Sequence, residues 1–574
     1  MKNLIFLFII VMAILTGCQT GKKKPQEVPQ YTSGLCAPPA LNDIAWFDED
    51  NKAPLFDGLD VFHFPITTSN ELAQKYVSQG LLLAYGFNHA EAARSFEYAT
   101  RLDTSCAMAY FGFAYVLGPN YNAGMEPDNY DRAFKAIQKA VELSDENCTP
   151  KEKALIHAMA ERYVEEPPGD RTSLDIAYSR AMQEVFKTFP DDPDIGTLYA
   201  ESLMNLHPWD LYTHEGEPRE WTAEILDALN RVMDIDPEHP GVHHFYIHAV
   251  EASSHPEQGL RSARLYDEGL VPGAGHLVHM PSHIYIRTGD YNKGTLSNIR
   301  AVEADSSYVT TCHAQGVYPL TYYPHNYHFM AATATLEGNS EIGIMAAQKV
   351  SDFSNRQLMK EPGWGTLQHY YSIPYYVKVK FGKWEEILKM QNEDPSLKYP
   401  EAIRHYARGM SYVGLGDMDK AKAELVFLQK YADDTSLKDI TVWEINNTYD
   451  LLQIARRVLK GEILASEHNF DESIVLLREA VALEDALNYN EPPDWFFSVR
   501  HHLGAVQVEA EKFKDAVATY KEDLEKFPKN GWALHGLQLA YAGLNENVKF
   551  TEVGTQLEKI WATADIELTS SRIK

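Results

Sequence analysis

Apolar residues recur every three or four positions along most of the chain, a spacing that predicts helices rather than strands. Between residues 70 and 560 these helical segments come in pairs with a shared pattern. The first helix of a pair holds a small residue; the second holds a small residue, most often alanine, then a large apolar residue four positions on. Gly80, followed by Ala92 and Phe96, is the first example. The chain is therefore predicted to be all-α.

The same pattern returns several times toward the C-terminus. These stretches resemble tetratricopeptide (TPR) repeats, whose period is about 34 residues and whose small residues let two antiparallel helices pack closely. The resemblance implies a TPR-like α-solenoid, a right-handed superhelix of antiparallel helix pairs with its first helices on the concave face. Further copies carry Ala114 with Ala133 and Ile137, Gly409 with Ala421 and Leu425, Gly461 with Ser473 and Leu477, and Gly504 with Ala516 and Tyr520.

The N-terminus predicts export and lipid attachment. A basic start leads into the apolar stretch Leu4–Leu15, which is too short to span a bilayer but suits the core of a signal peptide. The following residues, LTGC, resemble a bacterial lipobox, in which the chain is cleaved before the cysteine and lipid is attached to it. Because Gln19 follows Cys18, we expect a lipoprotein of the outer membrane, on its periplasmic or surface side, touching the membrane through this anchor only.

Repeat regularity gives the predicted organisation of the chain. The pattern is strict at both ends and looser in the middle, where prolines and insertions intervene. We predict a signal peptide (1–17), a lipid anchor and tether (18–54), N-terminal TPR repeats (55–190), central histidine-rich repeats (191–360) and C-terminal TPR repeats (361–574).

Charge and motifs exclude several classes of function. With 52 basic and 81 acidic residues the net charge is −29, so nucleic acid is not an expected partner, because phosphate binding needs a basic surface. The chain has no CxxC pair, no GxSxG nucleophile motif and no GxxxxGK[ST] phosphate loop. Cys106 and Cys148 begin and end one predicted helix pair, so a disulfide between them is predicted, with two unlinked thiols as the alternative.

Histidines in the central repeats keep a common register. Gly259, Gly294 and Gly343 mark the small residue that opens the second helix of three successive repeats. Histidines precede these landmarks at three fixed offsets, which differ by three and four and therefore share one face of the first helix. The offsets are fifteen residues (His244, His279, His328), eleven (His248, His283) and eighteen (His276, His325, and His369 before Ile387).

Packed helices lie about 8–10 Å apart, so imidazoles on neighbouring first helices are expected to meet. Glu251 continues the same face by one step. Three interpretations stay open: a transition-metal site for zinc, copper or iron, a metal-free groove for a peptide or small molecule, or polar packing inside the superhelix.

In the segment GHLVHMPSHIY, Pro281 either kinks one helix or begins a new one.

We therefore expect a binding protein whose concave site takes a transition metal or a metal-bearing ligand. The alternatives are a TPR scaffold that binds a peptide or protein partner in the groove, a metal-dependent hydrolase with Glu251 as the base, and SusD-like glycan binding. AGHLVHMPSHIYIRTGDY and YYPHNYHF resemble a bacterial branch of TPR proteins, which implies architecture and not chemistry. The expected ligands are His244, His248, His279, His283 and His328, followed by Glu251, His276 and His325.

Overall fold

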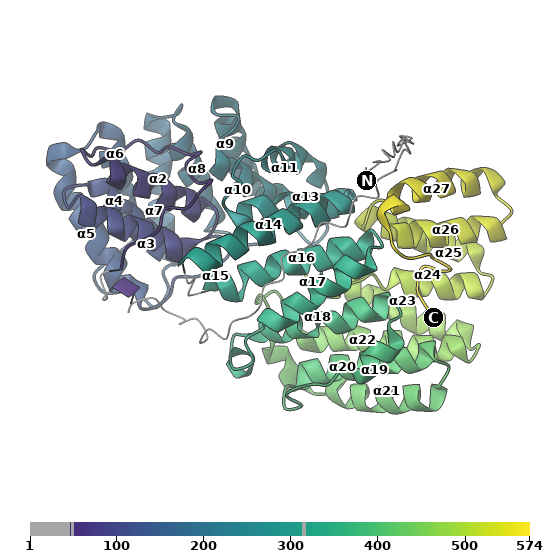
Figure 1. The fold of residues 1–574 in the computed structure, drawn as a ribbon. Coiled ribbons are helices and arrows are strands. Elements are labelled where there is room, and N and C mark those ends of the chain that lie inside the picture. The colour runs from purple at the N-terminus through teal and green to yellow at the C-terminus, as the bar shows by residue number, and fades with distance from the viewer. Residues whose placement is uncertain (1–45, 48–50, 313–316) are drawn as a thin grey trace, which may run out of the picture. The chain divides into compact units, whose positions relative to one another are not determined.

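A computed structural model describes residues 46–47, 51–312 and 317–574 (Figure 1). Regular structure in these residues is α-helical apart from short 3-10 turns and one small antiparallel ribbon, which pairs β1 (Thr441–Val442) with β2 (Asn446–Asn447). The predicted all-α class is therefore confirmed. Cys18, the predicted signal peptide and most of the tether lie outside the described residues, so lipid attachment stays a prediction.

Successive helices pack on one another as hairpins, and each hairpin contacts the next. Helix α2 (Glu71–Tyr85) packs on α3 (His89–Leu102), and α3 in turn contacts α4 (Ala107–Leu117), which packs on α5 (Asn129–Asn147). Asn70 caps α2 by accepting hydrogen bonds from two backbone amides of its first turn. The structure is a TPR-like solenoid of helix pairs, as the repeat pattern predicts.

The remaining helices continue this order along the chain. In the middle they are α6 (Pro150–Ala160), α7 (Thr172–Thr188), α8 (Pro193–Met204), α9 (Thr222–Ile235), α10 (Pro240–Glu251), α11 (Leu260–Asp267), α12 (Gly275–His279), α13 (Pro281–Thr288), α14 (Tyr291–Cys312), α15 (Val317–Leu320), α16 (Tyr322–Leu336), α17 (Ser340–Phe353) and α18 (Gly365–Lys380). Toward the C-terminus they are α19 (Trp384–Lys389), α20 (Lys398–Gly414), α21 (Met418–Ala432), α22 (Thr448–Ser466), α23 (Phe470–Asp485), α24 (Arg500–Glu509), α25 (Phe513–Lys526), α26 (Gly531–Gly543) and α27 (Asn547–Ile560).

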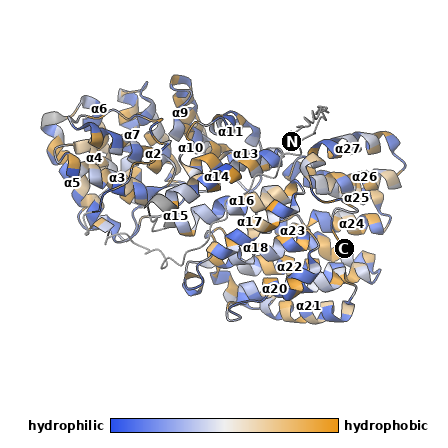
Figure 2. Cartoon of the chain, in the orientation of Figure 1, coloured by the Kyte–Doolittle hydropathy of each residue, from blue (hydrophilic) through white to orange (hydrophobic). Residues whose placement is uncertain are grey.

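The core follows the stack of helices. Buried apolar side chains form three clusters, drawn from residues 53–322, 286–532 and 516–553. Hydrophobic and hydrophilic positions are mixed along the helices (Figure 2), and among the described residues no helix is both long and apolar enough to span a bilayer. The first two clusters overlap between residues 286 and 322, from the end of α13 to the start of α16.

Phe96 explains the small residues of the repeat pattern. A Cβ placed on Gly112 would lie 2.1 Å from the Phe96 ring, and one placed on Gly80 would lie 2.9 Å from it. The large residue of the second helix thus fills space that both neighbouring first helices leave open. A side chain at either glycine would force the helices apart.

We expect Gly112→Ala to lower the free energy of unfolding by about 1–3 kcal/mol, the usual cost of overpacking a tight core. Urea denaturation followed by circular dichroism measures this change. Gly124→Ala is the matched control, because a Cβ there meets nothing within 4 Å. Equal stability losses in the two variants would contradict the packing explanation.

Cys106 and Cys148 are both free thiols in the structure, so the predicted disulfide is not formed. Cys106 immediately precedes α4 and Cys148 immediately follows α5. Burial raises the pKa of each thiol to about 11. The thiolate is the form that attacks to make a disulfide, so this environment opposes oxidation.

Candidate metal centre

The central repeats bring histidines from four helices to one place. His244 and His248 lie on α10, and His276 and His279 lie on α12. Pro281 is the first residue of α13, where its missing N–H costs nothing, so a new helix begins at the proline. His283 on α13 and His325 on α16 complete the group.

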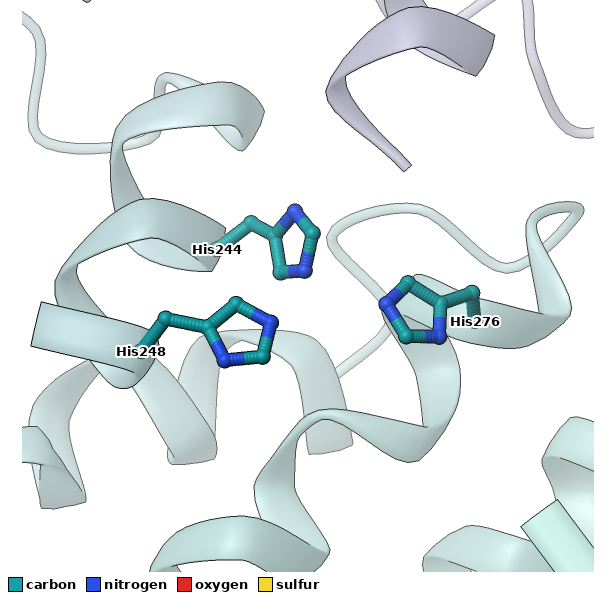
Figure 3. Close-up of side chains that lie close together, drawn as sticks. All are labelled: His244, His248 and His276. Atoms are coloured by element: carbon teal, nitrogen blue, oxygen red, sulfur yellow. The ribbon is translucent and has the colours of Figure 1, made fainter. Parts of the chain in front are cut away.

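His244, His248 and His276 form a first triad. One ring nitrogen from each lies within 4.8 Å of the others. Figure 3 shows the His244 and His248 rings projecting from one helix toward His276 on the facing segment. The ring centroids are 4.8 Å apart for His244–His248 and 5.1 Å for His244–His276. This spacing permits the three rings to bind one ion.

Hydrogen bonds fix the tautomers of the two α10 histidines. The Nδ1 atom of His244 donates to the Tyr85 carbonyl oxygen. The Nδ1 atom of His248 donates to Glu251 Oε1 at 2.7 Å. The Nε2 atom of each ring is buried without a hydrogen-bond partner, as are both ring nitrogens of His276. Metal-binding histidines in proteins are typically oriented by such Nδ1–H bonds.

His279, His283 and His325 form a second triad, whose ligand nitrogens also lie within 4.8 Å of one another. The Nδ1 atom of His279 lies 3.1 Å from Asn298 Oδ1, to which it donates. The Nδ1 atom of His283 donates to Glu251 Oε2. When both rings are neutral, these bonds place the protons on Nδ1, and the Nε2 atoms of His279 and His283 then present lone pairs to each other.

These two Nε2 atoms are 2.9 Å apart. Because facing lone pairs repel, this distance requires a cation between the rings, either a proton on one Nε2 atom or a metal ion. Two nitrogens bound to one ion at about 2.0–2.1 Å lie roughly 3 Å apart when they occupy neighbouring positions. The distance between the His279 and His283 rings therefore fits two ligands on one metal ion, and it also fits a hydrogen bond from a protonated His283.

Glu251 lies between the triads and supports both. Its side chain is 1% exposed, and its two oxygens accept from His248 and His283 respectively. Burial would raise the pKa of this carboxyl, but the adjacent His283 and His248 rings lower it below its usual value. Although Glu251 also lies within reach of an ion held by His248 and His283, its hydrogen bonds place it as the acceptor that orients the two rings.

Burial, and then repulsion from neighbouring imidazoles, lowers the pKa of His244, His276, His279 and His325 well below the usual 6.5. These rings are therefore neutral near pH 7. Neutral imidazole is the form that coordinates metals.

His328, the remaining predicted ligand, lies apart from both triads. Its ring stacks on Phe496 with centroids 4.9 Å apart and planes at 7°. Its nearest histidine ring is His369, at 5.9 Å. The structure thus brings together all the predicted metal ligands except His328.

Several residues around the triads were not predicted. Phe87 packs its ring 4.6 Å from His244, and it does so from a left-handed backbone conformation with φ of 54°. Trp443 and Ile445 come from the turn between β1 and β2 and line a cavity beside the triads. No local pattern marks these positions, because they reach the site only when distant repeats stack.

The cavity has a volume of about 80 Å³ and a larger cleft of about 640 Å³ adjoins it. The two hollows share Trp209, His248, Ile445, Asn490 and Glu491 as walls. Burial, followed by repulsion from Glu251, raises the pKa of Glu491 well above its usual range. Glu491 Oε2 has no hydrogen-bond partner and lies 3.9 Å from His283 Nδ1.

No protein-family model and no curated protein sequence matches this chain. Solved structures with related helical folds include human IFIT1 with PPP-AAAA, which is 12% identical, covers 88% of this chain and 99% of its own, and has a TM-score of 0.30. Yeast Tom70 is 12% identical over 84% and 90% of the two chains, with a TM-score of 0.26. The TPR domain of P58(IPK) is 10% identical over 83% and 99%, with a TM-score of 0.20. Similarity at this level does not extend to function.

Proposed function

We propose that this protein is a helical-repeat binding protein that holds a transition-metal ion in its buried histidine cluster. The observation that carries the proposal is the 2.9 Å separation of His279 Nε2 and His283 Nε2, whose Nδ1 atoms are both committed to acceptors. A metal ion between the two Nε2 atoms would remove the repulsion of their lone pairs, and a proton on one of them is the metal-free alternative that the experiment below tests.

The donor set favours particular metals. The triads offer neutral imidazole nitrogens and no thiolate, which suits zinc, copper, iron or nickel rather than calcium or magnesium. Three protein nitrogens leave a coordination position open, as in catalytic rather than structural zinc sites. Binding is the proposed role, and turnover at the open position is the hydrolase alternative.

The test is the metal content of the full-length chain, purified without a polyhistidine tag and measured by elemental mass spectrometry. We expect at least one equivalent of transition metal per chain. A variant with His244, His248, His279 and His283 all changed to Ala should lose it. His328→Ala is the matched control, because His328 is equally buried but lies outside the triads.

Two outcomes would count against metal binding. One is native protein with sub-stoichiometric metal that reconstitution does not restore. The other is metal content that the fourfold alanine variant leaves unchanged while circular dichroism shows native helicity. Either result would favour the metal-free groove, in which the cluster and the adjoining cleft bind a peptide, a protein or a small molecule.

We also propose that the protein is exported and anchored to the outer membrane through Cys18, with the histidine-rich repeats outside the cytoplasm. The support is the basic start, the apolar stretch and the LTGC sequence. Growth with radiolabelled palmitate should label the native chain and not a Cys18→Ser variant. Equal labelling of the two chains, or of neither, would refute the anchor.

A further inference from the structure

The two triads are built by the same rule. Each takes the histidines at offsets fifteen and eleven from one repeat and the histidine at offset eighteen from the next repeat. Each triad therefore takes ligands from two successive repeats, so it forms only when those two helix pairs stack on each other. The rule gives His244 and His248 with His276 for the first triad, and His279 and His283 with His325 for the second.

The next junction between repeats contains an incomplete third copy. At that junction, offset fifteen falls on His328 and offset eighteen of the next repeat falls on His369, and their rings lie 5.9 Å apart. The position at offset eleven is Ala332, so the third imidazole is missing. The chain thus contains two complete sets of three and one set that lacks a ligand.

The complete triads are immediate neighbours. The His248 and His283 rings, which belong to different triads, are 5.3 Å apart, as are the His276 and His279 rings. Centroid distances within the triads run from 4.7 Å for His279–His283 to 6.5 Å for His248–His276, so these two contacts between triads fall in the same range. Dinuclear protein sites hold their ions about 3.5–4 Å apart, and rings from the two triads in contact would bring an ion in each triad within reach of one bridging ligand.

Both triads also face the same cavity. Its wall includes His248 and His276 from the first triad and His283 and His325 from the second. A volume of about 80 Å³ has room for water or a small anion beside the histidines, since a cavity of roughly 10–15 Å³ by this measure already holds one water. A ligand there would contact both ions at once.

Charge decides the kind of ligand. Two divalent ions held by neutral imidazoles leave a buried excess of positive charge, which is costly without a compensating anion. Glu251 supplies one negative charge, and its two oxygens are already engaged by His248 and His283. Glu491, whose Oε2 atom has no hydrogen-bond partner, lines the cavity and can hydrogen-bond to a small guest.

We propose that the histidine cluster is a two-ion centre, with one transition-metal ion in each triad and one small anion in the cavity bridging them. The inference rests on the proposed metal-binding function and adds the number of ions, their proximity and the class of ligand. Hydroxide from water is the simplest such anion, and azide is a convenient probe of the same charge with only three heavy atoms.

The full-length chain, loaded with copper(II) and desalted, provides the test. We expect two copper ions per chain by elemental analysis. Because copper(II) ions that share a bridging anion couple magnetically, the EPR intensity should fall well below that of two isolated ions. Azide should change the absorption spectrum with saturation at one azide per two copper ions.

Three single variants assign the ions to the triads. His244→Ala should leave one copper, held by the second triad, and His325→Ala should leave one held by the first. In both variants the remaining ion should regain the full EPR intensity of an isolated copper(II). His328→Ala should keep two coupled ions, because the third set lacks a ligand at Ala332.

The outcomes separate this inference from the function on which it rests. A saturating content of one copper per chain would overturn the two-ion centre and leave metal binding intact. Two coppers with undiminished EPR intensity would also overturn it, since the ions would then be far apart. No bound copper, zinc, iron or nickel would overturn both proposals. Stoichiometry and EPR of the native chain decide the matter even where a variant fails to fold.

Discussion

Glu251→Ala is expected to lower the free energy of unfolding of the metal-free protein by about 3–5 kcal/mol, and to weaken metal binding about 10–100-fold. The Glu251 carboxylate is buried and accepts a hydrogen bond from His248 and another from His283. Its removal leaves two imidazole N–H groups without partners, and a buried donor without a partner costs about 1–3 kcal/mol. The rings then lose the orientation that directs Nε2 toward an ion.

Urea denaturation measures the first effect, and competition with a chromophoric chelator measures the second. Glu424→Ala is the matched control: Glu424 Oε2 accepts from His405 Nδ1 at 2.6 Å, in a histidine–glutamate pair far along the chain. We expect this control to lose stability and keep its metal affinity. An unchanged affinity in Glu251→Ala would mean that the carboxylate does not orient the triads.

Trp532→Ala should lower the free energy of unfolding by about 3–5 kcal/mol, the typical cost of truncating a buried aromatic residue. Trp532 is fully buried on α26, and its Nε1 donates to the Thr335 carbonyl oxygen at 2.9 Å. The Lys380 ammonium nitrogen lies 3.9 Å from the ring centroid, and Trp561 packs edge-on at 5.6 Å. The side chain therefore joins α26 to repeats almost two hundred residues earlier.

Thermal and urea unfolding of Trp532→Ala and Trp532→Phe measure this contribution. Phenylalanine keeps most of the ring packing and loses the N–H group, so we expect a smaller loss of about 1–2 kcal/mol. Metal content should not change in either variant, since Trp532 lies outside both triads. If Trp532→Ala lowered the free energy of unfolding by less than about 1 kcal/mol, the contact with Thr335 would contribute little to stability.

Much of the fold could be predicted because the residues that pack against one another within a repeat recur at fixed, short spacings in the sequence. Gly112 and Phe96 illustrate this. The Phe96 ring on α3 occupies space that Gly112 leaves open on the next helix, so the pattern requires a small residue there. The histidine register is equally local, since offsets that differ by three and four define one face of a helix. The sequence alone therefore predicts that the histidines of both triads lie on the same face of their helices.

The same register did not separate His328 from the others. His279 and His328 hold the same offset, yet one belongs to a triad and the other stacks on Phe496. Offsets define the face on which a ring lies, and each triad needs a ring from the following repeat as well. Ala332 breaks the third set, a gap that becomes visible only when the junction rule is known.

By itself the sequence determined the helices, their pairing and the common face of the histidines, because each depends on residues within one or two repeats. Only the tertiary structure decided how the histidines divide into two triads and that Pro281 starts a new helix. It also decided that Phe87 and Glu491 close the site. These residues lie far from the triads along the chain, and the way successive helix pairs stack, which no local periodicity encodes, brings them to it.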